Sequence, residues 1–326
     1  MKTRQRSVQG LGAAILVVAC GMALAQDAGG PIRIIQGFAP GGGHDTVARL
    51  LAPRVGAHVK SQTIVEARPG ANGIIAAEAV ARSTPDGSVI LLTGVSTFVL
   101  NQLVYAKVPY DTLKDFAPLT TVAATPQILV AHPGLPVKTL QDVTALAKRS
   151  PNKLSIGSPG VGGLSHLTLE VFKGLGKLEI EHVPYKGTAS ALTELLSGFV
   201  PMFIGDLPAP LPHVKSGKLR AIVVTGETRS SLLPDVPTAR EQGYPGLQAT
   251  NWYGVMVPAA TPPAVVSRLH AAFVSAVGAP ETRERYAGIG VDPLTSKTPA
   301  AFGSFVQEEF ARWGKVVRST GIRLQQ

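Results

Sequence analysis

Short apolar runs of strand length alternate with longer amphipathic stretches along this chain, and this alternation limits the fold more than any other feature. In the first third, the apolar runs predict strands at 32–35, 63–66 and 89–92. The amphipathic stretches between them predict helices at 45–57 and 73–82. Pro53 should kink the first helix or end it early. Strand, helix and strand in succession predict a mostly parallel sheet that helices cover on both faces.

The same alternation restarts after Pro126. Further strands are expected at 129–130, 154–157, 179–183, 202–205, 219–225 and 253–257. Further helices are expected at 139–148, 164–175, 189–196, 264–277 and 300–317. A chain of 326 residues is long enough for two domains of ordinary size, so we interpret it as two α/β units. Periodicity leaves open whether the last 75 residues or so return to the first unit.

The N-terminus has the pattern of a secretory signal peptide. Three cations (Lys2, Arg4 and Arg6) precede the apolar run 11–19, and a small-x-small site follows at 23–25. Cleavage after Ala25 removes those cations and the single cysteine, so the net charge of +10 falls to +7. A lipoprotein signal with acylated Cys20 is the competing interpretation, which we favour less because both small positions of the Ala25 site are filled. Both predict export, and we expect a periplasmic protein.

The composition excludes several classes of function. Lys and Arg are scattered, and an exported protein does not meet nucleic acid, so we expect a surface that attracts small anions instead. The seven histidines lie apart, so no metal site is expected. The dinucleotide fingerprint, the P-loop, the G-x-S-x-G elbow and the H-E-x-x-H motif are absent, and we expect neither a cofactor nor an enzyme. Ser, His and Asp all occur, but no spacing supports a catalytic triad.

A glycine-rich loop at 38–45 lies between a predicted strand and a predicted helix. Its glycines let the backbone approach a ligand, and the helix that follows presents N–H groups that favour an anion. Capping of that helix is our preferred role for Asp45, ahead of ligand contact. His44 is expected to be a solvent-facing or rim residue rather than a catalyst, because no partner is identifiable. The ligand-binding candidates of this loop are Phe38, Pro40, Gly41, Gly42, Gly43, His44 and Asp45.

A second glycine-rich loop at 157–166 has the same context. Ser165 is a natural N-cap, and His166 either faces the cleft or packs. The candidates here are Ser158, Gly160, Gly162, Ser165 and His166. Together the two loops predict two anion-binding helix ends, one in each domain.

Polar residues after other strands add weaker candidates. Asn72 lies in a turn before a helix, where turn chemistry explains it equally well. Asp206 follows a strand, where α/β proteins place their ligands, and orienting loop amides with its charge is the alternative role. Thr188 is the expected N-cap of the helix at 189–196. The remaining candidates are Ser96, Thr97, Tyr185 and Lys186.

Several ordered motifs resemble those of the Bug family, the substrate-binding proteins of tripartite tricarboxylate transporters. The resemblance runs from about Pro31 to the C-terminus. It departs from the family pattern at His44, where Thr or Ser is common, and at Pro159 and Val161, which replace small polar residues. The matching segments are PGGGHD at 40–45, ARLL at 48–51, EARPGANG at 66–73, HVPYKG at 182–187, GKLRA at 217–221 and LPDVPT at 233–238.

This resemblance implies a two-domain periplasmic binding protein of the Venus-flytrap type, with two crossing segments and a ligand cleft between the domains. After a signal peptide at 1–25, domain 1 would comprise 26–125 and 250–326, and domain 2 would comprise 126–249. A small organic acid (a di- or tricarboxylate, an acidic amino acid or an aromatic acid) would bind the amides of the two loops. The expected protein is a monomeric receptor that delivers its ligand to a membrane permease. The alternatives are a partner of a membrane sensor kinase, or an exported hydrolase or lyase that uses His44, Asp45 or His166.

Overall fold

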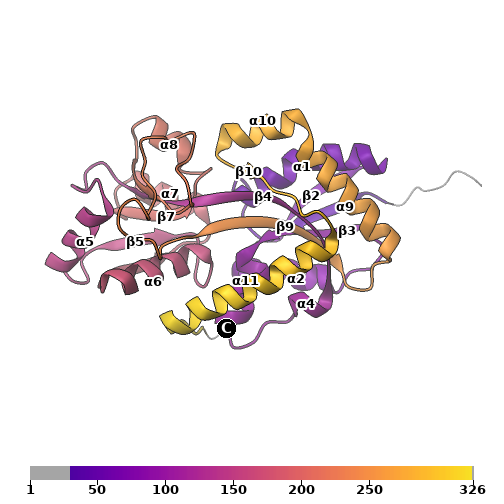
Figure 1. Cartoon of the computed structure of the whole chain (residues 1–326), viewed down its shortest axis with the longest axis horizontal. Helices are drawn as coiled ribbons and strands as arrows, with labels where there is room; N and C mark the ends of the chain where they lie inside the picture. The colour runs from indigo at the N-terminus through magenta and orange to yellow at the C-terminus, as the bar shows by residue number, and fades with distance from the viewer. Residues whose placement is uncertain (1–29, 325–326) are drawn as a thin grey trace, which may run out of the picture.

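Two lobes joined by two long strands make up the protein (Figure 1). The computed structural model describes residues 30–324, so the predicted signal peptide, its cleavage site and Cys20 lie outside the described residues. One continuous sheet passes through both lobes, with the strand order β2-β1-β3-β9-β4-β7-β5-β6. Strands β4 (Phe116–Ala131) and β9 (Thr250–Pro258) are antiparallel neighbours that run between the lobes.

Lobe 1 is built on β1 (Ile32–Gln36), β2 (Thr63–Ala67) and β3 (Val89–Gly94), which are parallel to one another, and on the antiparallel β9. Buried side chains form one apolar cluster on each face of this sheet. One face is covered by α1 (Gly43–Val59), α9 (Pro263–Gly278) and α10 (Pro280–Ile289). The other is covered by α2 (Ile74–Ala81), the helical segments η2 (Ser96–Leu100) and α3 (Asn101–Val104), and α11 (Pro299–Thr320). Short elements complete the lobe: η1 (Ala71–Gly73), α4 (Thr112–Asp115) and β10 (Asp292–Pro293).

Lobe 2 repeats this plan with a smaller sheet. Its strands are β5 (Ser155–Ser158), β6 (Glu181–Pro184), β7 (Met202–Asp206) and β8 (Arg220–Val224), together with the end of β4. Helices α5 (Leu140–Arg149) and α6 (Leu164–Gly176) contribute to the apolar cluster on one face. Helices α7 (Thr188–Leu196) and α8 (Leu211–Lys215) contribute to the cluster on the other.

The C-terminal helix α11 links the lobes on one side of the molecule (Figure 1). It packs along β4 and also contacts α6 of lobe 2. The buried carboxylate of Glu309 accepts hydrogen bonds from Trp252 Nε1 (2.8 Å) and Trp313 Nε1 (3.0 Å), and so fixes the helix to β9. The last part of the chain therefore returns to lobe 1, a question that periodicity left open.

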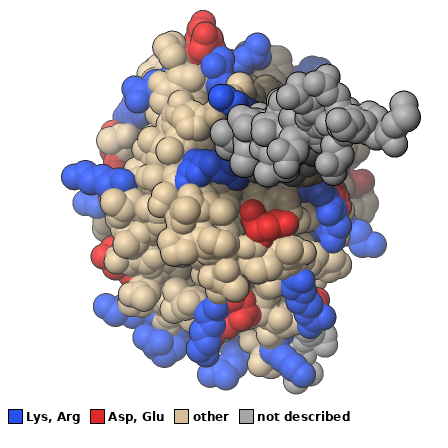
Figure 2. Space-filling model, turned by 90° about the vertical axis from the view of Figure 1, so that its right-hand side faces the viewer, with Lys and Arg blue, Asp and Glu red and all other residues tan. Residues whose placement is uncertain are grey.

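Most predicted elements are confirmed, with three corrections. Helix α1 does not end early at Pro53, because that residue lies on the exposed side, where water can bond the carbonyl that lacks its usual donor. The expected strand at 129–130 is only the end of β4, which runs through Pro126 and has bulges in its register. Helices α8 and α10 and the short elements η2, α3, α4 and β10 were not predicted. Figure 2 shows Lys and Arg side chains scattered over one end of the molecule, with acidic residues among them.

Candidate ligand-binding cleft

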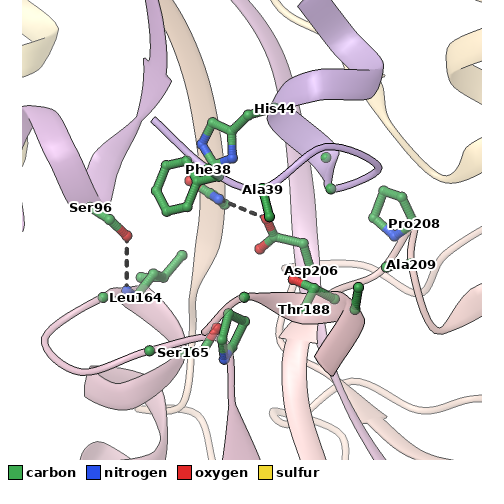
Figure 3. A pocket seen from close by; sticks show the side chains of 18 of the residues that line it. Phe38, Ala39, His44, Ser96, Leu164, Ser165, Thr188, Asp206, Pro208 and Ala209 are labelled. Atoms are coloured by element: carbon green, nitrogen blue, oxygen red, sulfur yellow. Dashed lines mark hydrogen bonds between the residues drawn. The ribbon is translucent and has the colours of Figure 1, made fainter. Parts of the chain in front are cut away.

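A cavity lies between the lobes at the carboxyl ends of their parallel strands, and Figure 3 shows it from close by. It encloses about 790 Å³ of space, its open mouth included. Both lobes and both linking strands contribute side chains, which is the usual arrangement of a ligand site in open α/β sheets. Ten of the sequence candidates line it: Phe38, Pro40, Gly42, Gly43, His44, Asn72, Ser96, Gly160, Ser165 and Asp206.

Three helix N-termini meet at this cavity. Helices α1, α6 and α7 begin after Gly42, Gly163 and Gly187, and all three glycines line the cavity. None of these helices is capped by the side chain of its own N-cap residue, since that residue is glycine in each case. The first-turn N–H groups and the positive ends of the helix dipoles therefore face a shared space, which favours an anion. The sequence predicted the first two of these helix ends and missed α7.

The first loop is held in shape by Asp45. Its Oδ2 accepts hydrogen bonds from the Gly41 N–H (3.1 Å) and from Arg49 Nε (2.9 Å). Burial raises the pKa of this carboxyl, but the bonds from Arg49 and Gly41 outweigh burial and hold the pKa below its usual range. Asp45 is the third residue of α1 rather than its N-cap, so the predicted capping role is corrected. Neither Asp45 nor Gly41 lines the cavity.

His44 forms part of the wall of the cavity. Its ring stacks on Phe38 with 4.2 Å between centroids, and it lies 4.4 Å from the ring of Tyr253. Burial lowers its pKa to about 3, so the ring is neutral at physiological pH. The expectation of a solvent-facing rim residue is therefore wrong. A side chain at Gly43 would place Cβ 2.4 Å from Tyr253 Oη, which explains why glycine is needed beside this stack.

Two histidines that lie outside the cavity lining hold the second loop in shape. His166 Nδ1 accepts the Gly162 N–H (3.0 Å), and His182 Nε2 is hydrogen-bonded to Ser158 Oγ (2.7 Å). The two imidazole rings stack 4.1 Å apart. Burial lowers the pKa of both, that of His182 to about 3. Ser158, Gly162 and His166 therefore support the loop and do not line the cavity.

Ser165 is the second residue of α6 and not its N-cap, which corrects the predicted capping role. Its Oγ lies in the cavity wall and accepts a hydrogen bond from Gln127 Nε2 at 2.8 Å. Thr188 is likewise the first residue of α7, and the N-cap position belongs to Gly187.

The lobes contact one another beside the second loop. Ser96 Oγ, in lobe 1, accepts a hydrogen bond from the Leu164 N–H of lobe 2 at 3.0 Å (Figure 3). Tyr105 Oη donates to the carbonyl of Val161 at 3.2 Å. Thr97 lies behind this contact, where its hydroxyl donates to the carbonyl of Asn72 at 3.1 Å. Thr97 thus shapes the turn that presents Asn72 and is not itself in the lining.

Asp206, at the end of β7, lies where the linking strands pass the cavity. Its Oδ2 accepts hydrogen bonds from Asn251 Nδ2 and Tyr253 Oη, both at 2.8 Å, and its Oδ1 accepts one from Gln127 Nε2 at 3.4 Å. Burial raises the pKa of the carboxyl, and these three bonds oppose that rise. The register of β4 sets this geometry, because it pairs Gln127 directly with Asp206.

The other candidates lie outside the cavity lining. Lys186 is exposed, and Tyr185 packs against Gly157 with a buried hydroxyl that has no partner. Two polar lining residues of the linking strands, Gln127 and Asn251, were not predicted, although both lie next to the expected domain borders. The rest of the missed lining is Ala39, Pro159, Gly163, Leu164, Gly187, Thr188, Ala189, Pro208 and Ala209.

Within residues 30–324, no group of three or more His, Cys, Asp or Glu side chains is placed to hold a metal ion. Across the same residues, no helix combines the length and apolarity needed to cross a membrane.

Comparisons with known proteins agree with this architecture. Residues 47–322 match the sequence profile of the tripartite tricarboxylate transporter family receptor. Protein BugT of Bordetella pertussis is 34% identical over 296 residues, which cover 90% of each chain. The R. palustris protein Rpa4515, solved with adipate, is 32% identical with a TM-score of 0.87, over 92% of this chain and 100% of that chain. MatC from Rhodopseudomonas palustris, solved with bound malate, is 31% identical with a TM-score of 0.82, over 88% of this chain and 98% of that chain.

The profile match spans most of the chain, and the solved relatives share its two-domain binding-protein fold. The family consists of receptors that bind solutes rather than of enzymes. The chain therefore belongs to the tripartite tricarboxylate transporter receptors, the family of periplasmic solute-binding proteins that includes BugT.

Proposed function

We propose that this protein captures a small organic carboxylate between its lobes and delivers it to a membrane permease of the tripartite type. The observation that carries the proposal is the meeting of three glycine-capped helix N-termini at one cavity. Backbone N–H groups and helix dipoles bind a carboxylate without a basic side chain. Relatives solved with adipate and malate support the same ligand class.

The lobes would move as two bodies, domain 1 of residues 26–125 and 250–326 and domain 2 of residues 126–249. The hinge would lie where β4 and β9 pass the cavity, near the register pair Pro126 and Thr250. A ligand that contacts helix starts from both lobes stabilises the closed form, because only that form makes both sets of contacts. The hydrogen bonds that Ser96 and Tyr105 make with lobe 2 would form when the lobes close.

An exported hydrolase or lyase finds less support in the geometry. His44 is a buried neutral ring, Asp45 is bonded to Arg49 and Gly41, and His166 supports the second loop from behind. These three side chains have separate partners and do not converge on one reacting atom, as acid–base catalysis requires.

A thermal-shift screen tests the proposal. Residues 26–326 are unfolded and refolded to remove bound solute, then heated with dicarboxylates, amino acids, aromatic acids and the matching neutral amides. A ligand at about 100 times its Kd adds about 2.7 kcal/mol of stability, which raises the Tm by several degrees. We expect a shift with an acid and none with its amide. A panel in which no acid shifts the Tm would overturn the proposal.

Delivery needs a separate measurement. Membrane vesicles that carry the tripartite permease should accumulate the labelled acid only when the receptor is added. Accumulation that does not depend on the receptor, with tight binding retained, would favour an output through a sensor kinase instead.

A further inference from the structure

Hydrogen-bond acceptors gather on one side of the cavity, where β7 meets the two linking strands. Asp206 is the only acidic side chain among the described residues that line the cavity, and that lining includes no Lys or Arg. Gln127 and Asn251 are 1% and 5% exposed, and their side-chain oxygens Oε1 and Oδ1 have no hydrogen-bond partner. A buried acceptor without a donor is unfavourable, so these oxygens mark a place where donors are missing.

The orientation of the two amides follows from Asp206. Asn251 Nδ2 and Gln127 Nε2 both reach its carboxylate, which accepts but does not donate when ionised. The nitrogen of each amide must therefore face Asp206, and each oxygen must turn away from it. A carboxylate accepts at about four lone-pair positions, and the protein occupies three of them. This cluster of Asp206, Gln127 and Asn251, which we call the acceptor cluster, still has acceptor capacity for a donor from outside the protein.

The rest of the cavity has the opposite character. The starts of α1, α6 and α7 present N–H donors with a partial positive charge. Figure 3 shows Asp206 rising from the end of β7, between Ala39 of the first loop and Thr188 at the start of α7. A solute held here meets donors at the helix starts and acceptors at the cluster. A dicarboxylate would satisfy the first group and place its second negative charge near Asp206, where like charges repel.

We propose that this cleft selects a carboxylate that carries an ammonium group, as an amino acid does, over the same acid without that group. Asp206 is the residue that sets this preference, by pairing with the ammonium while Gln127 and Asn251 accept its remaining hydrogens. The inference rests on the proposed function, because it names the solute class of the same cleft. It separates this chain from relatives whose solved ligands are the ammonium-free acids adipate and malate.

Matched pairs of acids test the proposal, because the members of each pair differ by one ammonium group. The pairs are L-aspartate with succinate, L-glutamate with glutarate, and L-phenylalanine with 3-phenylpropionate, measured by calorimetry on residues 26–326. For the pair that binds, we expect the amino acid to bind about 10- to 100-fold more tightly, as for a hydrogen-bonded charge pair. Equal affinity within the pair, or tighter binding of the acid without the ammonium, would overturn the proposal.

The Asp206→Asn variant distinguishes recognition from a purely structural role. Its Oδ1 can still accept from Tyr253 or Asn251, so the strand end keeps a partner while the charge is lost. We expect the affinity for the amino acid to fall about 10- to 100-fold and that for the matched acid to stay unchanged or rise. Tyr253→Phe is the control, since it removes one bond to Asp206 but keeps the charge, and it should weaken both members of a pair equally. If Asp206→Asn lowers the affinity for both members of a pair equally, Asp206 has only a structural role between the strands, and the proposal is overturned.

The outcomes for the cleft and for its preference are separable. If an acid from the wider thermal-shift panel binds while no amino acid does, the proposed receptor function stands and the preference is wrong. If no acid of any kind binds, both proposals fail.

Discussion

The two glycine-rich loops have the same place in the fold, after a strand and before a helix, but different chemistry holds them. In the first loop, Asp45 bonds the Gly41 amide and Arg49, so α1 shapes its own N-terminal loop. In the second, the imidazoles of His166 and His182 bond the Gly162 amide and Ser158, and His182 belongs to a neighbouring strand. Ser96 Oγ of the other lobe also accepts a hydrogen bond from the N–H of Leu164, at the end of the second loop. The first loop is thus formed locally, whereas the second depends on its neighbours.

Alanine at one glycine of each loop, the first residue of α1 (Gly43) or the N-cap of α6 (Gly163), should separate the loops most strongly. At Gly43, a Cβ would lie 2.4 Å from Tyr253 Oη, in a stack that is fully packed and holds Asp206. At Gly163, the nearest atoms are the side-chain ends of Asn72 (3.1 Å) and Ser96 (3.4 Å), which belong to the other lobe and can move. Overpacking should cost Gly43→Ala about 2 kcal/mol.

We therefore expect Gly43→Ala to lower the Tm by several degrees and to weaken ligand binding about tenfold or more. Gly163→Ala should change the Tm little. Gly174→Ala is the control, because no atom lies within 4 Å of its added Cβ. Calorimetry and thermal melts measure both quantities. Equal losses of Tm in the two loop variants would contradict the difference between the loops.

Acid should disturb the second loop more than the first. The folded pKa values of His166 and His182 lie below the unfolded value of about 6.5, so the unfolded chain binds protons first as the pH falls. Their contribution to stability is complete above pH 6.5 and is lost as the pH falls toward their lowered pKa values, which for His182 is about 3. Asp45 behaves as a carboxyl with a lowered pKa, whose contribution is lost only below about pH 4. His44 adds one acid-sensitive ring to the first loop, against two in the second.

The measurement is the Tm between pH 7 and 4.5, where the free energy of unfolding should fall by up to about 1.4 kcal/mol per pH unit for each histidine that is protonated only in the unfolded chain. The double variant His166→Gln/His182→Gln should flatten this slope more than His44→Gln does, because it removes two titrating groups. Glu170 and Lys173 lie beside the pair and have opposite effects on the pKa of His166, so neither reverses the sign. A slope that only His44→Gln flattens would place the acid sensitivity in the first loop.

The same contrast explains what could be predicted from the sequence. Both loops were predictable because glycine runs between an apolar strand and an amphipathic helix are local signals. Which residues face the cavity was harder to infer, because successive helical residues point about 100° apart. Ser165 therefore faces the cavity while His166 turns to His182. The start of α7 was not predicted as an anion site because Thr188 is a plausible N-cap, whose hydroxyl would bond the first-turn N–H groups itself, whereas the N-cap is Gly187.

Contacts between segments distant in the sequence were the least predictable part of the site. Gln127 and Asn251 are polar residues next to the predicted domain borders, and a strand that crosses between domains must pass the cleft. Both residues were therefore predictable from their position at these borders. The hydrogen bonds that unite them at Asp206 depend on the register of β4 with β7, which its bulges with β9 make hard to infer from periodicity.

The smallest expected effect concerns the hydrogen bond between the second loop and lobe 1, which the Leu164 N–H donates to Ser96 Oγ. Ser96→Ala removes the acceptor of the Leu164 N–H, a hydrogen bond that contributes about 1 kcal/mol. Because that bond forms only when the lobes meet, its loss should shift the protein toward an open form and weaken ligand binding about fivefold. The exposed Ser197, changed to Ala, is the matched control. Small-angle scattering and calorimetry report the two changes. Tighter binding by Ser96→Ala would mean instead that Ser96 competes with the ligand for the Leu164 amide, and that the second loop, like the first, presents its whole helix start to the solute.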